Sequence, residues 1–389
     1  MKLVCSFLLS LFALSSCIAS SAKEEIAQIF SLADIQLNGT RAWDITVHNE
    51  GFYDRVLSGG SLALGESYMD GWWDSAALDD CMAHILQAHL DEEVTFTWDL
   101  FVAYCKASFS NLQDKMGSMK VIDQHYQLGN DLYSKMLDPL MMYSCGYWKS
   151  ASQLEQAQEA KCDLICKKLG LQKGMRVLDI GCGWGGFSKY AAEHYGVEMV
   201  GITLSENQAK QAREVCKGLP VEIRVQDYRD LNESFDRILE IGMFEHVGVK
   251  NYPIFMQTVH RCLKPGGLFM LHTIGRNSSG NITDPWIEKY IFPNSVLPSI
   301  SQIGSSVEGL FVMEDWHNFG CDYDKTLMAW FRNFDAHWSS LQQVYGPRFY
   351  RMWKYYLLSC AAAFRTRNIQ LWQVVLAKEG VAGGYSRIQ

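Results

Sequence analysis

The stretch Val177–Gly186, with the sequence VLDIGCGWGG, decides the fold that we expect. The apolar residues Met175–Ile180 predict a short strand, four glycines then fall within six positions, and a helix is predicted over Phe187–His194. Glycine lets a backbone turn sharply and approach a ligand closely. The helix N-terminus that follows presents free N–H groups and a partial positive charge. The stretch suits a nucleotide-like ligand with a carboxylate or phosphate, although a plain tight turn has the same pattern.

Strands and helices alternate after this turn. Apolar runs predict strands at Val197–Leu204, Val221–Val225, Phe235–Gly242 and Leu268–Ile274. Helices are predicted at Glu206–Lys217, opened by a capping box of Ser205 and Gln208, and at Tyr252–Leu263. Alternation at this spacing predicts an α/β fold with a mostly parallel sheet and helices on both faces.

The C-terminal part is expected to complete this fold. Two helices are predicted, at Thr326–Gln343 and Pro347–Arg365, followed by a strand at Ile369–Ala377 that we expect at the sheet edge. The segment Asn281–Val312, rich in Pro and Ile, is expected to be an irregular insertion. Its place in the chain is that of a lid or pocket wall.

Several polar features fall at the carboxyl ends of the predicted strands, where ligands bind in open α/β sheets. They are the glycine turn, Gly201–Ser205, Asp227, Glu245–His246 and His272. This convergence predicts a cofactor site. A dinucleotide site expects an acidic residue at the end of the second strand, but Thr203 and Ser205 stand there. Asp179 before the turn and the sequence LKPGG before the fifth strand instead resemble S-adenosylmethionine-dependent methyltransferases.

Composition indicates a globular protein and narrows its partners. The 389 residues are 48% hydrophobic and 20% charged, with a net charge of −8. This charge gives no support for nucleic-acid binding, although it leaves room for a local basic patch facing anionic lipid. Aromatic residues make up 13% of the chain. They fit a large core, or a core with an apolar pocket for a lipid-like substrate.

The cysteines and the N-terminus give conflicting indications about the compartment. The twelve cysteines are scattered, with no zinc-type ligand spacing, so we expect no metal site and reduced thiols. Residues 1–21 nevertheless look like a signal or membrane-associating segment, since Lys2 precedes a mostly apolar stretch. Leu14–Cys17 resembles a bacterial lipoprotein cleavage box. The stretch is short and interrupted for a spanning helix.

Residues 22–109 predict a smaller, mainly helical unit. Helices are expected at Glu24–Leu37, from Phe52 to the pair Gly59–Gly60, and near Leu78–Leu90 and Thr95–Phe109. A short strand is expected at Trp43–Val47, and Leu62–Trp73 is predicted to be a turn-rich aromatic stretch. Residues 110–120 are expected to be a linker to a catalytic domain at 121–389.

Long motifs make the chain resemble the cyclopropane-fatty-acyl-phospholipid synthase family. They are Leu64–Trp73, Tyr143–Cys145, Leu178–Gly186, Gly201–Gln208, Gln226–Asp230, Gly242–Gly248, Leu271–Gly275, Glu314–Gly320 and Asp322–Tyr323. The resemblance covers essentially everything after residue 22, in order. It implies a class I S-adenosylmethionine methyltransferase fold, Rossmann-like with a mostly parallel seven-stranded sheet, behind a smaller N-terminal helical domain that binds lipid.

The resemblance implies transfer of a methylene group from S-adenosylmethionine to a cis double bond in a phospholipid acyl chain. Attack by the alkene leaves a carbocation, which aromatic faces can stabilise, and in this family a bound bicarbonate removes the proton that closes the ring. The cofactor residues carried over are Tyr143, Ser144, Asp179, Gly181, Cys182, Gly183, Trp184, Gly185, Gly186, Thr203, Leu204, Ser205, Gln208, Asp227 and Tyr228.

The residues carried over for bicarbonate are Cys145, Glu245, His272, Ile274 and Tyr323. His272 and Tyr323 would donate to its oxygens, backbone groups of Cys145 and Ile274 would add contacts, and Glu245 would accept its hydroxyl proton. Cys360 corresponds to a cysteine near the family's site and is expected to be a packing or access residue. Read without the family, these cysteines are small buried hydrophobes and His272 is a core residue.

Partners and alternatives follow from the same resemblance. We expect an unsaturated phospholipid bilayer as substrate, a homodimer, and a cytoplasmic enzyme on the inner face of the membrane, where S-adenosylmethionine is available. A small-molecule methyltransferase with the same sheet would not need Glu245. A non-catalytic lipid-binding or carrier protein would not bind S-adenosylmethionine.

Overall fold

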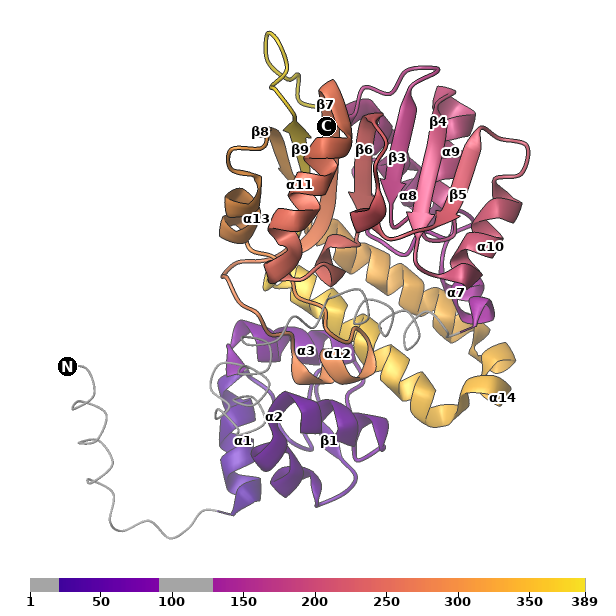
Figure 1. The fold of residues 1–389 in the computed structure, drawn as a ribbon. Coiled ribbons are helices and arrows are strands. Elements are labelled where there is room, and N and C mark those ends of the chain that lie inside the picture. Colours follow the sequence, from indigo (N-terminus) through magenta and orange to yellow (C-terminus); the bar gives the residue numbers. More distant parts are fainter. Residues whose placement is uncertain (1–20, 91–128, 389) are drawn as a thin grey trace, which may run out of the picture.

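A seven-stranded sheet forms the centre of the computed structural model, which describes residues 21–90 and 129–388 (Figure 1). In spatial order its strands are β5 (Val221–Val225), β4 (Glu198–Thr203), β3 (Arg176–Ile180), β6 (Phe235–Ile241), β7 (Leu263–Arg276), β9 (Ile369–Ala377) and β8 (Val312–Asn318). The first five run parallel, and β9 is antiparallel to both of its neighbours. The predicted mostly parallel, seven-stranded α/β sheet is confirmed.

Helices cover both faces of the sheet, so the central strands are apolar on both sides. The helices of this part are α7 (Asn130–Met136), α8 (Leu154–Lys168), α9 (Gly186–Tyr195), α10 (Glu206–Val215), α11 (Tyr252–Cys262) and α13 (Ile300–Val307). Val177 of β3 packs in one core with α8 and α9, whereas its neighbour Leu178 packs in another with α11 and α13. Alternate residues of a strand face opposite sides, and burial of both sides is typical of parallel sheets.

The predicted position of the last strand was wrong. β9 lies between β7 and β8, and the edge strand is β8. Eight of the nine residues of β9 are buried, which suits an inner strand, whereas β8 keeps two exposed apolar residues, Val312 and Met313. The sequence VMEDWHN of β8 mixes charges with apolar residues, so its pattern did not mark it as a strand.

The segment 281–312 is more regular than expected. It contains α12 (Pro285–Tyr290), capped by the Asp284 side chain, and α13, which Ser299 opens with a capping box to Gln302. Short helices of this kind escape periodicity arguments because they span only one or two turns.

The smaller unit contains α1 (Ala22–Leu32), α2 (Phe52–Met69), α3 (Leu78–Gln87) and a two-stranded ribbon, β1 (Thr46–Val47) with β2 (Trp73–Asp74). The helix from Phe52 does not end at Gly59–Gly60, because α2 only kinks at Gly60 and continues to Met69. Most of the stretch predicted to be turn-rich is therefore helical. The predicted helix 95–109, the linker 110–120 and the N-terminal segment 1–20 lie outside the described residues.

Helix α14 (Cys321–Arg365) runs between the sheet and the smaller unit (Figure 1). Its φ of 69° at Gly346, just before Pro347, divides it into the two predicted helical segments, although the first begins five residues earlier than expected. α14 contacts α2, α3 and α7, and α12 contacts α2. Rings from all three parts meet where Trp286 of α12 lies 4.7 Å from Tyr355 of α14, and Tyr355 lies 5.5 Å from Tyr68 of α2.

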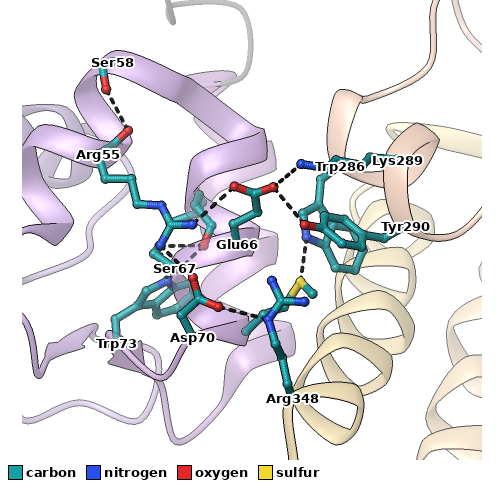
Figure 2. A network of polar contacts seen from close by, with 12 residues as sticks. Arg55, Ser58, Glu66, Ser67, Asp70, Trp73, Trp286, Lys289, Tyr290 and Arg348 are labelled. Carbon is teal, nitrogen blue, oxygen red and sulfur yellow. Dashed lines mark hydrogen bonds and ion pairs between the residues drawn. The ribbon is translucent and has the colours of Figure 1, made fainter.

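A network of ion pairs and hydrogen bonds fixes α12 to α2 (Figure 2). Glu66 Oε1 accepts hydrogen bonds from Lys289 Nζ at 2.6 Å and from the Tyr290 hydroxyl at 2.8 Å. Its other oxygen accepts one from Arg55 Nη2 at 3.2 Å. Gly65 also lies against the Trp286 ring, so closely that a Cβ atom there would overlap the ring. Glu66 and Gly65 belong to the LGESYMDGWW motif, and these two residues hold α2 against the insertion.

Candidate active site

A cavity of about 190 Å³ opens at the carboxyl ends of β3, β4 and β6, around the glycine turn. All of the predicted cofactor residues line it except Gly185 and Ser205. Those two act on the backbone instead. Gly185 has a φ of 84° as the N-cap of α9, a left-handed conformation that favours glycine. The Ser205 hydroxyl accepts a hydrogen bond from Gln208 N–H at 3.3 Å as the N-cap of α10.

The predicted capping box of Ser205 and Gln208 is only half formed. The side chain of Gln208 does not return to the Ser205 N–H. Its Oε1 accepts a hydrogen bond from the Thr203 hydroxyl at 3.0 Å, and Thr203 Oγ1 in turn accepts one from Ser205 N–H at 3.2 Å. This arrangement places Thr203 and Gln208 together on the cavity wall.

Close backbone packing explains one glycine of the turn. A Cβ atom at Gly186 would overlap the carbonyl oxygen of Leu140. The absence of a side chain lets the segment that carries Tyr143 and Ser144 lie against the turn, and both residues line the cavity. The first N–H groups of α9 are then directed to the cavity end of the sheet.

One buried ionisable group, Asp179, lines this cavity, and a second, Lys161, is bonded to a lining residue. Asp179 is 2% exposed and accepts a hydrogen bond from the Ser188 hydroxyl at 3.0 Å; burial raises its pKa to about 7, which the nearby Lys161 counteracts. Lys161, which the sequence reasoning missed, is fully buried and donates to Ser144 Oγ at 2.8 Å. Burial lowers the pKa of its ammonium group.

Asp227 holds an ion pair at the other wall of the cavity. Arg229 Nε and Nη2 donate to its two oxygens at 2.8 and 2.7 Å, and the Arg229 N–H adds a third bond at 2.9 Å. Arg229 was not among the predicted residues, but it also lines the cavity. The two side chains present one rigid polar group beside Tyr228.

The six predicted catalytic residues are absent from the lining of this cavity. Glu245 and Ile274 are joined by a hydrogen bond of 2.7 Å, from the Ile274 N–H to Glu245 Oε1. Backbone groups of Ile274 were predicted to contact bicarbonate, and here the Ile274 N–H orients Glu245. Glu245 Oε2 is buried and has no hydrogen-bond partner among the described residues, and burial raises the pKa of this carboxyl group to about 7.

His272 precedes Ile274 by two residues on β7, so the two side chains share a face of the sheet. The ring is 1% exposed. Its Nδ1 lies 3.1 Å from Nε2 of Gln373, whereas its Nε2 is buried with no partner among the described residues. Burial, and then the charges of Lys161 and Lys168, hold its pKa well below the usual range, so the ring is neutral.

The remaining three catalytic candidates lie on or against α14. Tyr323 and Cys360 belong to α14, and Cys145 packs against it. Thr326, one turn after Tyr323, has its hydroxyl 3.9 Å from Cys145 Sγ. Burial, followed by the charges of Cys145, Tyr143, Glu245 and Cys360, raises the pKa of the Tyr323 phenol well above its usual range. Burial also raises the pKa of Cys145 strongly and that of Cys360 to about 12. Both cysteines are protonated thiols, which fits packing and not nucleophilic attack.

Aromatic rings connect this group to the cavity. The hydroxyl of Tyr143, a cavity residue, lies 2.8 Å from that of Tyr356. The ring of Trp330 lies 5.1 Å from Tyr143 and 5.9 Å from Tyr323. The ring of Phe292 packs between Tyr356, at 5.8 Å, and the cavity residue His246, at 5.9 Å. The region between cofactor cavity and catalytic candidates is thus apolar and rich in ring faces.

Glu240 is a buried residue of the site that the sequence reasoning did not identify. It is fully buried at the end of β6, and its carboxylate accepts hydrogen bonds from the N–H groups of Met243 at 2.8 Å, Phe244 at 3.1 Å and His272 at 3.0 Å. Burial, and after it the charge of Glu245, raises its pKa well above the usual range. A single glutamate in the apolar run FDRILEI is the signal that could have found it.

Within residues 21–90 and 129–388, no three or more His, Cys, Asp or Glu side chains are grouped so that they could hold a metal ion. The same part of the chain contains no helix with the length and hydropathy to cross a membrane. Its nine cysteines are all free, and seven are buried.

A family model, a related sequence and a solved structure all place this chain in the same family. The family model for mycolic acid cyclopropane synthetase matches residues 113–374. A cyclopropane-fatty-acyl-phospholipid synthase of Escherichia coli is 54% identical over 92% of this chain and 93% of its own length. The structure of the cyclopropane synthase MmaA2 from Mycobacterium tuberculosis superposes with a TM-score of 0.64 at 32% identity, over 69% of this chain and all of MmaA2.

A second solved structure adds a bound ligand. The mycolic acid cyclopropane synthase CmaA1, crystallised with SAH and CTAB, is 33% identical with a TM-score of 0.62, over 67% of this chain and 98% of its own. The resemblance predicted from the sequence motifs is confirmed. The chain belongs to the mycolic acid cyclopropane synthetase family and has the fold of a class I S-adenosylmethionine-dependent methyltransferase.

Proposed function

We propose that this chain transfers a methylene group from S-adenosylmethionine to the cis double bond of an unsaturated phospholipid acyl chain, giving a cyclopropane fatty acyl phospholipid. The observation that carries the proposal is the pairing of two sites: a glycine-walled cavity at the carboxyl ends of the strands, and beside it the buried, incompletely bonded side chains of Glu245 and His272. An ordinary methyltransferase needs only the first.

The cavity suits S-adenosylmethionine. The glycine turn and the α9 N-terminus offer N–H groups to a carboxylate, and Asp179 and the Asp227–Arg229 pair supply polar partners on two walls. The described lining contains the motif residues that the family uses, with Tyr143 and Ser144 closing the side toward α14. The relative with bound SAH supports this assignment.

The proposed methyl transfer to the alkene does not need an ionised side chain as nucleophile. The alkene π electrons attack the methyl carbon while the carbon–sulfur bond breaks, and a carbocation remains on the neighbouring alkene carbon. The faces of Tyr143, Trp330 and Tyr356 lie in the apolar region where this charge would develop, and cation–π attraction there is worth about 2 kcal/mol when water is excluded. The ring closes when a base removes one proton from the transferred methyl group, whose C–H electrons form the last bond.

Bicarbonate supplies that base when it is bound. The side chains present fit such an ion, since His272 offers a donor at Nε2 and Glu245 an acceptor at Oε2, both buried and without partners among the described residues. The Tyr323 hydroxyl, which is protonated, is a second donor. Because Glu245 accepts the ion's own O–H, its ionised form holds the ion in one orientation.

Two further proposals concern the smaller unit and the oligomeric state of the protein. We propose that the smaller unit, residues 22–109, contacts the bilayer while an acyl chain enters the site. We also propose that the enzyme works as a homodimer on the inner face of the membrane, where S-adenosylmethionine is made. Sedimentation with anionic vesicles and light scattering of the purified protein test these two points separately.

Activity on vesicles tests the main proposal. The full chain is incubated with methyl-radiolabelled S-adenosylmethionine, bicarbonate and vesicles of dioleoyl phosphatidylglycerol, and the released fatty acids are separated. We expect label in the cyclopropane derivative of oleate and none with vesicles of the saturated distearoyl lipid. Label only in water-soluble acceptors would favour a small-molecule methyltransferase, and failure to bind S-adenosylmethionine by calorimetry would favour a carrier.

A further inference from the structure

Three strands place His272, Gln373 and His317 in one row across the sheet. His272 of β7 and His317 of β8 are both register partners of Gln373 on β9. Register partners carry their side chains on the same face of a sheet. Gln373 is fully buried and His272 nearly so. The amide of Gln373 therefore meets the imidazole of His272 away from water, as a contact fixed by strand pairing.

The direction of the contact decides which nitrogen of His272 carries the proton. Gln373 Nε2 lies 3.1 Å from His272 Nδ1. In this orientation of the amide, Gln373 Nε2 can only donate, so Nδ1 is the accepting nitrogen, and Gln373 Oε1 is buried without a partner among the described residues. In a neutral ring the proton is then on Nε2. Burial and the charges of Lys161 and Lys168 disfavour a second proton on this ring, because they lower its pKa.

We propose that Gln373 is a positioning residue that fixes His272 as the Nε2–H tautomer, so that the neutral ring donates a hydrogen bond to the anion of the site. This inference rests on the proposed function for the identity of the anion. It gives β9, which carries no predicted site residue, a part in the chemistry. The role parallels that of carboxylates and carbonyls that orient metal-bound histidines through their other nitrogen.

The opposite tautomer would not serve an anion. With its proton on Nδ1, His272 would present a lone pair at Nε2, and the ionised Glu245 carboxylate can also only accept. An anion with a single O–H could satisfy one of these acceptors but not both. The geometry with Gln373 as donor leaves one donor and one acceptor, which matches the two kinds of oxygen in bicarbonate.

Nitrogen NMR measures the tautomer without any turnover. The full chain is labelled with ¹⁵N-histidine, and the His272 signals are assigned by their loss in His272→Asn. We expect a protonated Nε2 and a bare Nδ1 in the unsubstituted chain. A proton on Nδ1 in that spectrum overturns the proposal, and this holds even if the Gln373 variants misfold.

A variant of nearly the same shape tests whether Gln373 is the cause. In Gln373→Glu a carboxylate replaces the amide donor, so we expect a proton on Nδ1. Gln370→Glu, on the same strand but at an odd spacing and thus on the other face, is the matched control and should leave the His272 signals unchanged. Unchanged signals in Gln373→Glu would contradict the proposal.

Binding of ¹³C-bicarbonate separates this inference from the proposed function. Gln373→Leu should weaken bicarbonate binding about 10- to 100-fold while S-adenosylmethionine binding is retained, because one hydrogen bond to a charged ligand loses its preset donor. If His272 shows the expected tautomer but bicarbonate does not bind the unsubstituted chain, the anion assignment fails and the role of Gln373 in fixing the tautomer stands. If Gln373→Leu binds bicarbonate as tightly as the unsubstituted chain does, the proposal that Gln373 prepares His272 for the anion is overturned.

Discussion

Glu245 has two carboxylate oxygens in different surroundings. Oε1 is fixed by the Ile274 N–H at 2.7 Å, whereas Oε2 is buried without a partner among the described residues. Its main chain is held as well, since its carbonyl oxygen accepts a hydrogen bond from the Val296 N–H at 2.9 Å. A buried acceptor costs free energy unless it is bonded, so the unpaired oxygen is expected to serve a ligand.

Replacing Glu245 with Gln tests this oxygen. The amide keeps the shape and can still accept from Ile274, but it no longer provides a carboxylate for the O–H of bicarbonate. We expect turnover at saturating S-adenosylmethionine to fall by about 100-fold or more, with cofactor binding retained. The exposed Glu308→Gln, at the end of α13, is the matched control and should behave like the unsubstituted chain. Full turnover in Glu245→Gln would remove the anion site from the account.

The pH dependence of turnover follows from the same group. Burial raises the pKa of Glu245 to about 7, and the ionised form, which predominates above this pKa, is the one that accepts the proton. Turnover should therefore rise with pH through about 7 and fall below it. The measurement is the rate against pH with the concentration of bicarbonate ion held constant. A rate that stays level down to the ordinary range of a glutamate, near 4.5, would disagree with this role.

Among single residues, the sequence allowed us to predict those that lie in motifs but not the residues that contact them. Glu245, His272 and Tyr323 stand in stretches that resemble a family, so they could be proposed as site residues. Glu240, Lys161 and Gln373 were missed because each acts through a contact over more than ten residues or between strands. Such contacts depend on register and packing, which local patterns do not contain. The same is true of the Gln208 side chain, which bonds to Thr203 and not to its own helix N-terminus.

Among the elements, α12 links the smaller unit to the site. One side of it is fixed to α2 by Glu66 (Figure 2). The segment that follows α12 is bonded to Glu245, because the Val296 N–H donates to the Glu245 carbonyl oxygen. Trp286 in α12 packs against both Gly65 and Tyr355. The position of α12 therefore influences both the stability of the contact and the geometry of the catalytic group.

A pair of glycine substitutions measures how tightly this element is packed. Gly65→Ala would force the Trp286 ring to move, and overpacking of this kind costs about 1–3 kcal/mol. Gly304→Ala, in α13, meets nothing within 4 Å and should instead stabilise the helix by about 0.5–1 kcal/mol. Urea unfolding of both variants gives the two free energies. Equal and stabilising effects would show that α2 and α12 are not in close contact.

Elements were predicted well where local pattern decides them. The strands from β3 to β7 and their helices were found, since apolar runs and turn residues mark them. The order of β8 and β9 in the sheet was not predicted. These two strands pair antiparallel although α14 separates them in the chain, and such a pairing produces no local sequence pattern. The continuation of α2 past Gly60 depends on burial of Tyr68 and Met69 against other elements, which outweighs the unfavourable glycines.

In the whole molecule, one aromatic core joins parts far apart in the chain. Trp73 of the smaller unit, Trp286 of the insertion and Trp353 of α14 all belong to it, and all are almost fully buried. The sheet lies on one side of α14, and the smaller unit lies on its other side (Figure 1). The smaller unit and the cavity at the carboxyl ends of the strands therefore lie on opposite sides of α14, an arrangement that fits the proposed contact of this unit with lipid.

The isotope content of the product tests the central claim most directly. The chain is given S-adenosylmethionine with a trideuterated methyl group, bicarbonate and dioleoyl phosphatidylglycerol vesicles, and the fatty acids are analysed by mass spectrometry. The account predicts a cyclopropane chain that has gained one carbon and kept two of the three deuterons, because a base removes the third before the ring closes. A methyl-branched chain that keeps all three deuterons, or a lipid without label, would contradict it.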